Sequence, residues 1–144
     1  MEREQKLVIY TDGGARSNPG PAALGVVIGD KHYNEYLGRA TNNEAEYYAV
    51  IFALQKAKQL LGKATAKKTE IEINTDSELI YKQLDGKYKI KETNLQQLFI
   101  HVWNAQQDFK KVTYKLVPRE ENKQADRLVN EALDKRDRGP QRLL

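Results

Sequence analysis

Hydrophobic and polar residues follow two different spacings along this chain, and these spacings predict strands and helices in a definite order. Short apolar or alternating runs predict strands, whereas apolar residues repeated at three- and four-residue intervals predict helices. Strands are expected at 5–12, 22–29, 32–40, 69–75 and 112–116. Helices are expected at 43–61, 77–84, 93–108 and 121–135. The first three strands follow one another, with a hairpin between the second and the third, and the later strands are joined through helices. This order predicts an α/β fold with a five-stranded mixed sheet flanked by helices.

The length of 144 residues fits one domain with a core of its own. We expect this domain at residues 1–136 and a mobile C-terminal tail at 137–144, because that tail is charged and contains Gly139-Pro140. The hydrophobic content of 40% and the charged content of 31% are typical of soluble globular proteins. We expect the protein to be a monomer.

Composition also limits the chemistry. The chain has no cysteine, which excludes disulfides, zinc-thiolate sites and a thiol nucleophile. Its start lacks an apolar signal core and no stretch is apolar enough to span a bilayer, so we expect a cytoplasmic protein without a membrane partner. A net charge of +4 favours a polyanionic partner only weakly, because 20 acidic residues balance most of the 24 basic ones.

Two aspartates stand at the ends of similar strands. Asp12 and Asp76 each follow a threonine at the end of a short apolar strand. Ligand sites of α/β proteins gather beyond the carboxyl ends of such strands, so both aspartates are candidate ligands. Each also has a structural explanation, since Asp12 precedes Gly13 in a dipeptide common in turns and Asp76 could cap the helix after it.

Two further acids stand early in predicted helices. Glu46 continues the apolar face of helix 43–61, whereas Glu44 lies about 160° around the helix axis. The core side of this helix is predicted to contain Ala49, Val50, Ala53, Leu54, Ala57, Leu60 and Leu61. Asp126 borders the apolar face of the last helix. The alternatives are an acid that complements the helix dipole for Glu46 and a solvated acid for Asp126.

If these four carboxylates converge, they predict a site for hard divalent cations. Crowded carboxylates repel one another and their pKa values rise unless a cation compensates. Mg²⁺ prefers oxygen ligands and is often shared with substrate phosphates. Two ions about 4 Å apart could activate water on one side of a phosphodiester and stabilise the leaving oxygen on the other.

Over nearly its whole length the chain resembles the type 1 ribonuclease H family. The matching segments, in chain order, are Thr11-Asp12-Gly13-Gly14 with Asn18-Pro19-Gly20-Pro21, Thr41-Asn42-Asn43-Glu44-Ala45-Glu46, Thr75-Asp76-Ser77 and Asn122-Lys123-Gln124-Ala125-Asp126. The resemblance implies the ribonuclease H-like fold. It also implies hydrolysis of the RNA strand of RNA/DNA hybrids with two Mg²⁺ or Mn²⁺ ions, leaving 5′-phosphate and 3′-hydroxyl ends.

The resemblance also implies roles for individual residues. Those matching the metal-binding carboxylates of the family are Asp12, Glu46, Asp76 and Asp126. Asn18, Asn42 and Asn43 would contact the hybrid across its minor groove, where the 2′-hydroxyl distinguishes RNA from DNA. Thr41 would help to hold a phosphate of the DNA strand. The structural alternative for Thr41, Asn42 and Asn43 is capping of the helix that they precede.

The chain departs from many relatives in the loop before its last helix. Arg119 stands where many relatives carry a histidine, and a guanidinium cannot shuttle protons at neutral pH. We therefore expect Arg119 to hold a phosphate or a developing charge. Glu78 stands where some relatives use a glutamine that contacts the substrate.

A second departure is the short segment after helix 77–84. Some relatives insert a helix and a basic protrusion there, which this chain is too short to contain. Lys87, Lys89 and Lys91 could supply a smaller phosphate contact, or they could form a solvated turn.

Two other functions stay open for the protein as a whole: a catalytically silent nucleic-acid-binding module, and a nuclease of the same fold that acts on RNA/RNA duplexes or DNA junctions.

Overall fold

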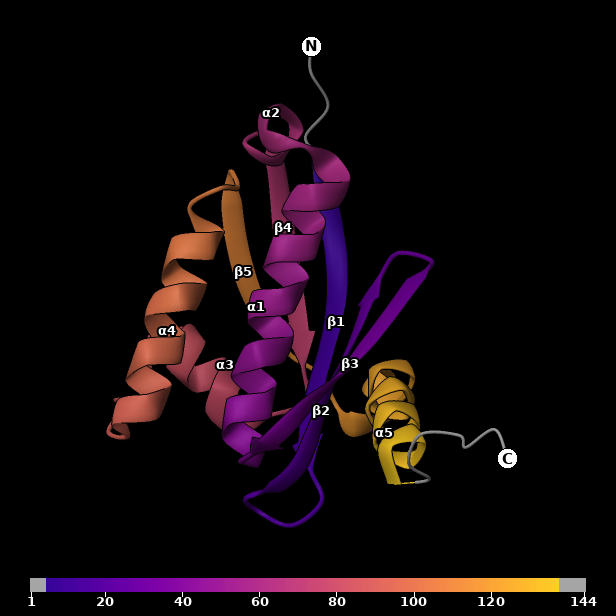
Figure 1. Ribbon diagram of the computed structural model, residues 1–144. Helices are drawn as coiled ribbons and strands as arrows, with labels where there is room; N and C mark the ends of the chain where they lie inside the picture. The colour runs from indigo at the N-terminus through magenta and orange to yellow at the C-terminus, as the bar shows by residue number, and fades with distance from the viewer. Residues whose placement is uncertain (1–4, 138–144) are drawn as a thin grey trace.

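The computed structural model describes residues 5–137, which form five strands around which the helices pack (Figure 1). The strands are β1 (Gln5–Ala15), β2 (Gly20–Ile28), β3 (Lys31–Ala40), β4 (Thr69–Thr75) and β5 (Lys111–Leu116). Their order in the sheet is β3-β2-β1-β4-β5, with antiparallel pairs on the β3 side and parallel pairs on the β5 side. The predicted five-stranded mixed sheet is therefore confirmed.

The helices are α1 (Asn42–Leu61), α2 (Lys63–Ala66), α3 (Glu78–Leu84), α4 (Thr93–Gln106) and α5 (Lys123–Asp137), with a 3₁₀ turn at Arg119–Asn122. α2 was not predicted, because one turn of helix is too short to show a period. The tail predicted at 137–144 lies outside the described residues apart from Asp137, which ends α5. The domain boundary at 136 stays a prediction.

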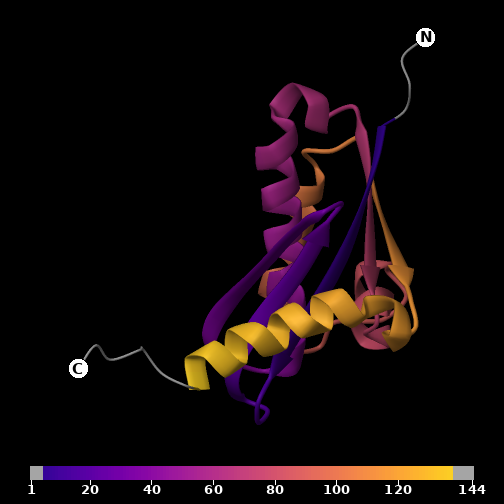
Figure 2. The ribbon, with the colours of Figure 1, turned by 90° about the vertical axis from the view of Figure 1, so that its right-hand side faces the viewer.

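The two faces of the sheet carry different helices because side chains alternate along each strand. On β2, Leu24 and Val26 belong to the main core, where α1 and α4 pack. Ala23, the neighbour of Leu24, contacts Val129 and Leu133 of α5 instead. Figure 2 shows α1 and α5 on different sides of the strands. α5 thus packs on β2, β3 and β1.

The long helix α1 begins at a capping box. The Thr41 hydroxyl accepts a hydrogen bond from the Glu44 backbone N–H at 3.1 Å, and the Glu44 carboxylate accepts one from the Thr41 N–H at 2.9 Å. These contacts satisfy two backbone donors that a helix start leaves without partners. The predicted core face is confirmed except for Leu60, which is 43% exposed, whereas Leu61 in the same turn packs against the core.

Other predicted boundaries shift by a few residues. Gly13 and Gly14 extend β1 beyond its predicted end at residue 12, because its antiparallel pairing with β2 continues to Ala15 opposite Ala22. The predicted helix 93–108 begins at Thr93 as expected, with Glu92 in the cap position, and ends two residues early at Gln106. Within residues 5–137, no helix is long and apolar enough to cross a membrane.

Candidate active site

Three of the four predicted carboxylates meet at one end of the sheet. Asp12, Glu46 and Asp76 each place an oxygen within 4.8 Å of the other two. The parallel register of β1 and β4 aligns Tyr10 with Asn74, so the aspartates two residues further on lie at the same level. They line a cleft of about 360 Å³. The prediction that Asp12 and Asp76 lie together beyond the ends of their strands is therefore confirmed. The N-cap of α3 is Ser77 and not Asp76.

Gly13 allows the first helix to approach the first strand. A Cβ at this position would lie 2.3 Å from the Ala45 carbonyl carbon and 2.5 Å from the Glu46 nitrogen, closer than atoms can approach. Only glycine, which has no Cβ, permits this contact between backbones. The contact brings Glu46, which is 8% exposed, next to Asp12. Helical spacing correctly predicted the buried face for Glu46.

Asp126 reaches the same cleft from the other face of the sheet. A Cβ on Gly25 would lie 2.3 Å from the Ala125 carbonyl oxygen, so this glycine lets α5 pack directly on β2. Asp126 is exposed and lines the cleft, but it is not one of the three carboxylates within 4.8 Å of each other. Its negative charge nevertheless raises the pKa of Asp12. Asp126 therefore lies at the rim of the site.

Burial and mutual repulsion raise the pKa values of Asp12, Glu46 and Asp76 and so favour their neutral forms. Burial, followed by the charges of Asp76 and Asp126, raises the pKa of Asp12 from 3.8 to about 7. Burial and the charges of Asp12 and Asp76 raise the pKa of Glu46 well above its ordinary value. Burial also raises the pKa of Asp76, although the nearby Arg119 guanidinium opposes this change. Three ionised carboxylates in this space are thus unfavourable without a compensating cation.

The donor set fits a divalent metal ion. The Glu46 Oε2 atom is buried and has no hydrogen-bond partner among the described residues, which is costly for a polar atom. A cation in the cleft would give this oxygen a partner and would compensate the charge of its neighbours. Carboxylate oxygens are the ligands that Mg²⁺ and Mn²⁺ prefer.

Arg119 and Asn122 approach the site from the turn before α5. The Arg119 Nε lies 3.9 Å from the Asp76 Oδ2, and its side chain is 89% exposed. The buried Asn122 amide donates to the Thr11 carbonyl at 3.0 Å, which attaches this turn to the end of β1. Sequence reasoning did not identify Asn122 as a site residue. Its place at the start of the matching segment Asn122-Lys123-Gln124-Ala125-Asp126 was a signal that could have identified it.

The predicted hybrid-contacting residues do not all reach the cleft. Asn42 lines it, whereas Asn18, Thr41 and Asn43 do not. The Asn42 N–H donates to the Asn18 side-chain oxygen at 2.9 Å, and the Asn42 side-chain oxygen accepts from the Ala15 N–H at 2.8 Å. These bonds attach the β1–β2 loop to the start of α1. The N-cap is Thr41, so the capping alternative is confirmed for Thr41 and wrong for Asn42 and Asn43.

Glu78 is not among the residues that line the cleft. It instead binds Lys82 at 2.6 Å on the exposed side of α3. Lys87 binds Asp85 at 3.3 Å in the following turn. A contact of these residues with substrate stays a prediction.

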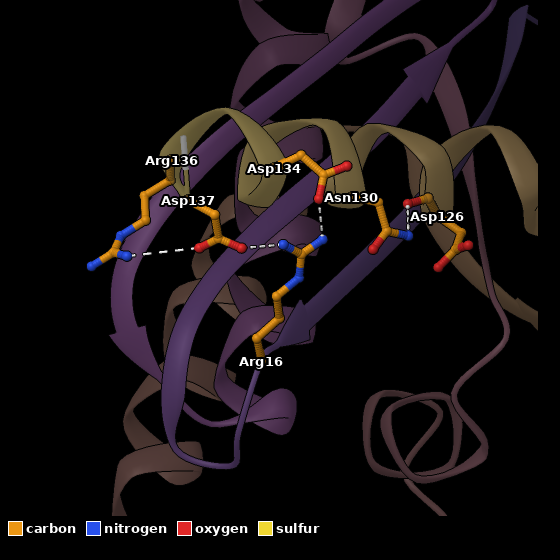
Figure 3. A network of polar contacts seen from close by, with 6 residues as sticks. All are labelled: Arg16, Asp126, Asn130, Asp134, Arg136 and Asp137. Atoms are coloured by element: carbon orange, nitrogen blue, oxygen red, sulfur yellow. Dashed lines mark hydrogen bonds and ion pairs between the residues drawn. The ribbon is translucent and has the colours of Figure 1, made fainter. Parts of the chain in front are cut away.

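Arg16 is a cleft residue that sequence reasoning missed. Its guanidinium contacts Asp134 of α5 at 2.5 Å and also pairs with Asp137 (Figure 3). On the same helix, the Asn130 amide donates to the Asp126 carbonyl at 3.1 Å. Arg16 and Asn130 both line the cleft. A single arginine in a polar loop gives no sequence signal that its side chain lines a cleft or pairs with a distant helix.

This geometry agrees with comparisons to known proteins. Residues 10–132 match the family described as reverse transcriptase-like. Ribonuclease HI of Halobacterium salinarum is 38% identical over 139 residues, covering 92% of this chain and 67% of that protein. A bifunctional protein of Mycobacterium tuberculosis is 38% identical over 136 residues, covering 90% of this chain. The chain spans 36% of the length of the first curated relatives that it matches.

The fold also matches solved structures of other proteins. The crystal structure of LC11-RNase H1, a protein isolated from compost, was obtained in complex with an RNA/DNA hybrid. It superposes with a TM-score of 0.84 at 42% identity, covering 89% of this chain and 96% of that one. The family match extends over most of the described residues, and these relatives are well above 30% identical. This chain therefore belongs to the type 1 ribonuclease H family and has its five-stranded fold.

Proposed function

We propose that this protein is an endonuclease that hydrolyses the RNA strand of RNA/DNA hybrids with two Mg²⁺ or Mn²⁺ ions and leaves 5′-phosphate and 3′-hydroxyl ends. The observation that carries the proposal is the convergence of Asp12, Glu46 and Asp76 within 4.8 Å, in a cleft open to solvent. Support for the substrate comes from family membership and from LC11-RNase H1, whose structure contains an RNA/DNA hybrid.

The buried acids would hold the metal. Asp12, Glu46 and Asp76 offer oxygens from three different elements, and Asp126 offers a fourth carboxylate from the rim of the cleft. Bound divalent ions would supply an activated water and stabilise the leaving oxygen of a phosphodiester. The role of the four side chains is to fix these positions before substrate arrives, since strand register and two close glycine contacts hold their backbones.

The β1–β2 loop and the start of α1 would face the hybrid. The Asn42 N–H donates to the Asn18 side-chain oxygen, and the Asn42 side-chain oxygen accepts from the Ala15 N–H, so both side chains are held beside the cleft. Amide side chains can donate to and accept from a 2′-hydroxyl, the group by which RNA differs from DNA. We therefore assign to this pair, with Asn43 beside it, the recognition of the RNA strand.

Arg119 would hold a phosphate oxygen or the charge that develops on it. Its side chain projects into solvent, and its Nε lies 3.9 Å from the Asp76 Oδ2, at the limit for an ion pair. A guanidinium stays protonated at neutral pH and cannot transfer the proton of the attacking water. Arg119 is therefore not the group that accepts this proton.

The direct test compares labelled RNA/DNA, RNA/RNA and DNA/DNA duplexes, each with Mg²⁺, Mn²⁺ or a chelator. We expect cleavage of the RNA strand of the hybrid with metal and no cleavage with the chelator. Mapping the ends of the products checks for 5′-phosphates. Cleavage of RNA/RNA or DNA/DNA in preference to the hybrid would identify another nuclease of this fold, and binding without cleavage would identify a silent module.

Asp76→Asn tests the metal site itself. We expect it to lower kcat by at least about a hundredfold while hybrid binding largely survives, because a ligand is lost but the shape is kept. Asp30→Asn makes the same chemical change at an exposed turn between β2 and β3 and serves as the matched control. Turnover by Asp76→Asn equal to that of the control would remove the basis of the assignment.

A further inference from the structure

We propose that Arg16 binds a phosphate of the nucleic acid at the mouth of the cleft, and that Asp134 and Asp137 hold its guanidinium while no substrate is bound. This inference rests on the proposed function, because it assigns to the same cleft a further substrate contact. Neither the resemblance nor the four carboxylates point to this arginine.

The first argument is the charge of the cleft. Its lining includes four carboxylates, on Asp12, Glu46, Asp76 and Asp126, which repel a phosphodiester backbone. The cationic residues in that lining are Arg16 and Arg119. Arg119 already approaches Asp76 on the α3 side, so Arg16 is the cation on the side of α5 and the β1–β2 loop. A polyanion that crosses the cleft needs a positive group there.

The second argument is that the backbone of Arg16 is fixed while its side chain is accessible. The Arg16 N–H donates to the Pro21 carbonyl at 2.8 Å across the loop, and the preceding Ala15 N–H is bound by Asn42 at 2.8 Å. The guanidinium itself is on the surface, with the side chain 38% exposed. Only side-chain rotation is needed to move it from one anion to another.

The third argument concerns the two aspartates. The side chains of Asp134 and Asp137 are 58% and 42% exposed, so water screens their attraction for Arg16 and such pairs are weak. The planar guanidinium is also well matched to phosphate, which it can bind through two parallel hydrogen bonds. A phosphate of the hybrid can therefore replace the aspartates. In Figure 3 the Arg16 side chain extends from the loop to the last two turns of α5.

A purely structural tether between the loop and α5 makes a different prediction. If the ion pairs only held these elements together, removing either side of them would weaken function in the same direction. If the aspartates compete with substrate for Arg16, removing the arginine weakens hybrid binding and removing the aspartates strengthens it. The two sides of the network then have opposite effects.

The experiment measures Kd for a short RNA/DNA hybrid by fluorescence anisotropy in chelator, over a series of KCl concentrations, and kcat and KM with Mg²⁺. The variants are Arg16→Gln, the pair Asp134→Asn with Asp137→Asn, and all three changes together. The control for the arginine is Arg127→Gln, an exposed residue of α5 outside the cleft lining. The control for the aspartates is Asp30→Asn with Glu131→Gln, which removes the same two charges elsewhere.

We expect Arg16→Gln to raise Kd and KM by about three- to tenfold, with kcat nearly unchanged, and to reduce the slope of log Kd against log salt by about 0.9, the value for one lost phosphate contact. The aspartate pair should lower Kd more than its control, and this gain should vanish when Arg16 is also replaced. Equal losses on both sides of the network would overturn the proposal, as would a salt slope unchanged by Arg16→Gln. If the wild-type protein neither binds nor cleaves the hybrid, the proposed function itself fails.

Discussion

Replacing Asp12 by asparagine should stabilise the metal-free protein above neutral pH, although it removes a candidate metal ligand. Asp12 is 8% exposed and lies beside Asp76 and Glu46, so its ionised form is disfavoured in the folded state. Asparagine has nearly the same shape and can still accept a hydrogen bond from the Gly13 N–H. It therefore removes the unfavourable charge without leaving a cavity.

The magnitude follows from the pKa of Asp12, which rises from 3.8 to about 7. Because the folded state holds this proton more tightly than the unfolded state, stability is highest below about pH 4 and falls until about pH 7. Each pKa unit corresponds to about 1.4 kcal/mol, so an ionised Asp12 costs about 4 kcal/mol of folding free energy at about pH 8. Near pH 4 the cost almost vanishes.

The assay is urea unfolding in chelator at about pH 4, 5 and 8, with wild type, Asp12→Asn and the exposed control Asp30→Asn. We expect the advantage of Asp12→Asn to grow with pH and the control to match wild type throughout. Adding Mg²⁺ at about pH 8 should raise the Tm of wild type more than that of Asp12→Asn, since a ligand that binds only the folded state stabilises it. An advantage that is absent at about pH 8, or that shrinks as pH rises, would refute the reasoning.

Three further substitutions test other parts of the structure. Gly25→Ala places a Cβ 2.3 Å from the Ala125 carbonyl oxygen, so we expect a loss of about 3 kcal/mol in urea unfolding and reduced cleavage, whereas Gly14→Ala, whose nearest contact is 3.6 Å, should cost far less. Thr41→Ala removes the N-cap of α1 and should cost about 1 kcal/mol, which Thr41→Ser should restore; equal unfolding curves for all three proteins would contradict this. Arg119→Ala should lower kcat by about tenfold in initial-rate assays, because a charge contact but no proton transfer is lost, and a complete loss would show that this side chain does more.

The parts of the site that local patterns control could be predicted from sequence. Helical spacing separated Glu46 from Glu44, and the structure buries the first and uses the second in the capping box. The similar strand ends predicted that Asp12 and Asp76 lie together, because parallel strands in register end at the same edge of the sheet. In both cases one element, or one pair of neighbouring elements, determines the outcome.

The parts that depend on packing between distant segments could not be predicted in this way. Asp126 had no strong signal of its own, since its position depends on the contact of Gly25 with Ala125 across the sheet. The pairing of Arg16 with Asp134 joins residues more than a hundred positions apart. No periodicity reports on such contacts, and Asp126 was placed with the other carboxylates only through the resemblance to the family.

The distribution of the four carboxylates along the chain also determines when the protein can become active. Asp12 lies on the first described strand and Asp126 on the last described helix, with Glu46 and Asp76 between them. A chain still leaving the ribosome cannot complete this set until α5 has emerged and docked on the sheet. The proposed nuclease can therefore become active only after α5 has been made and has docked on β2, β3 and β1.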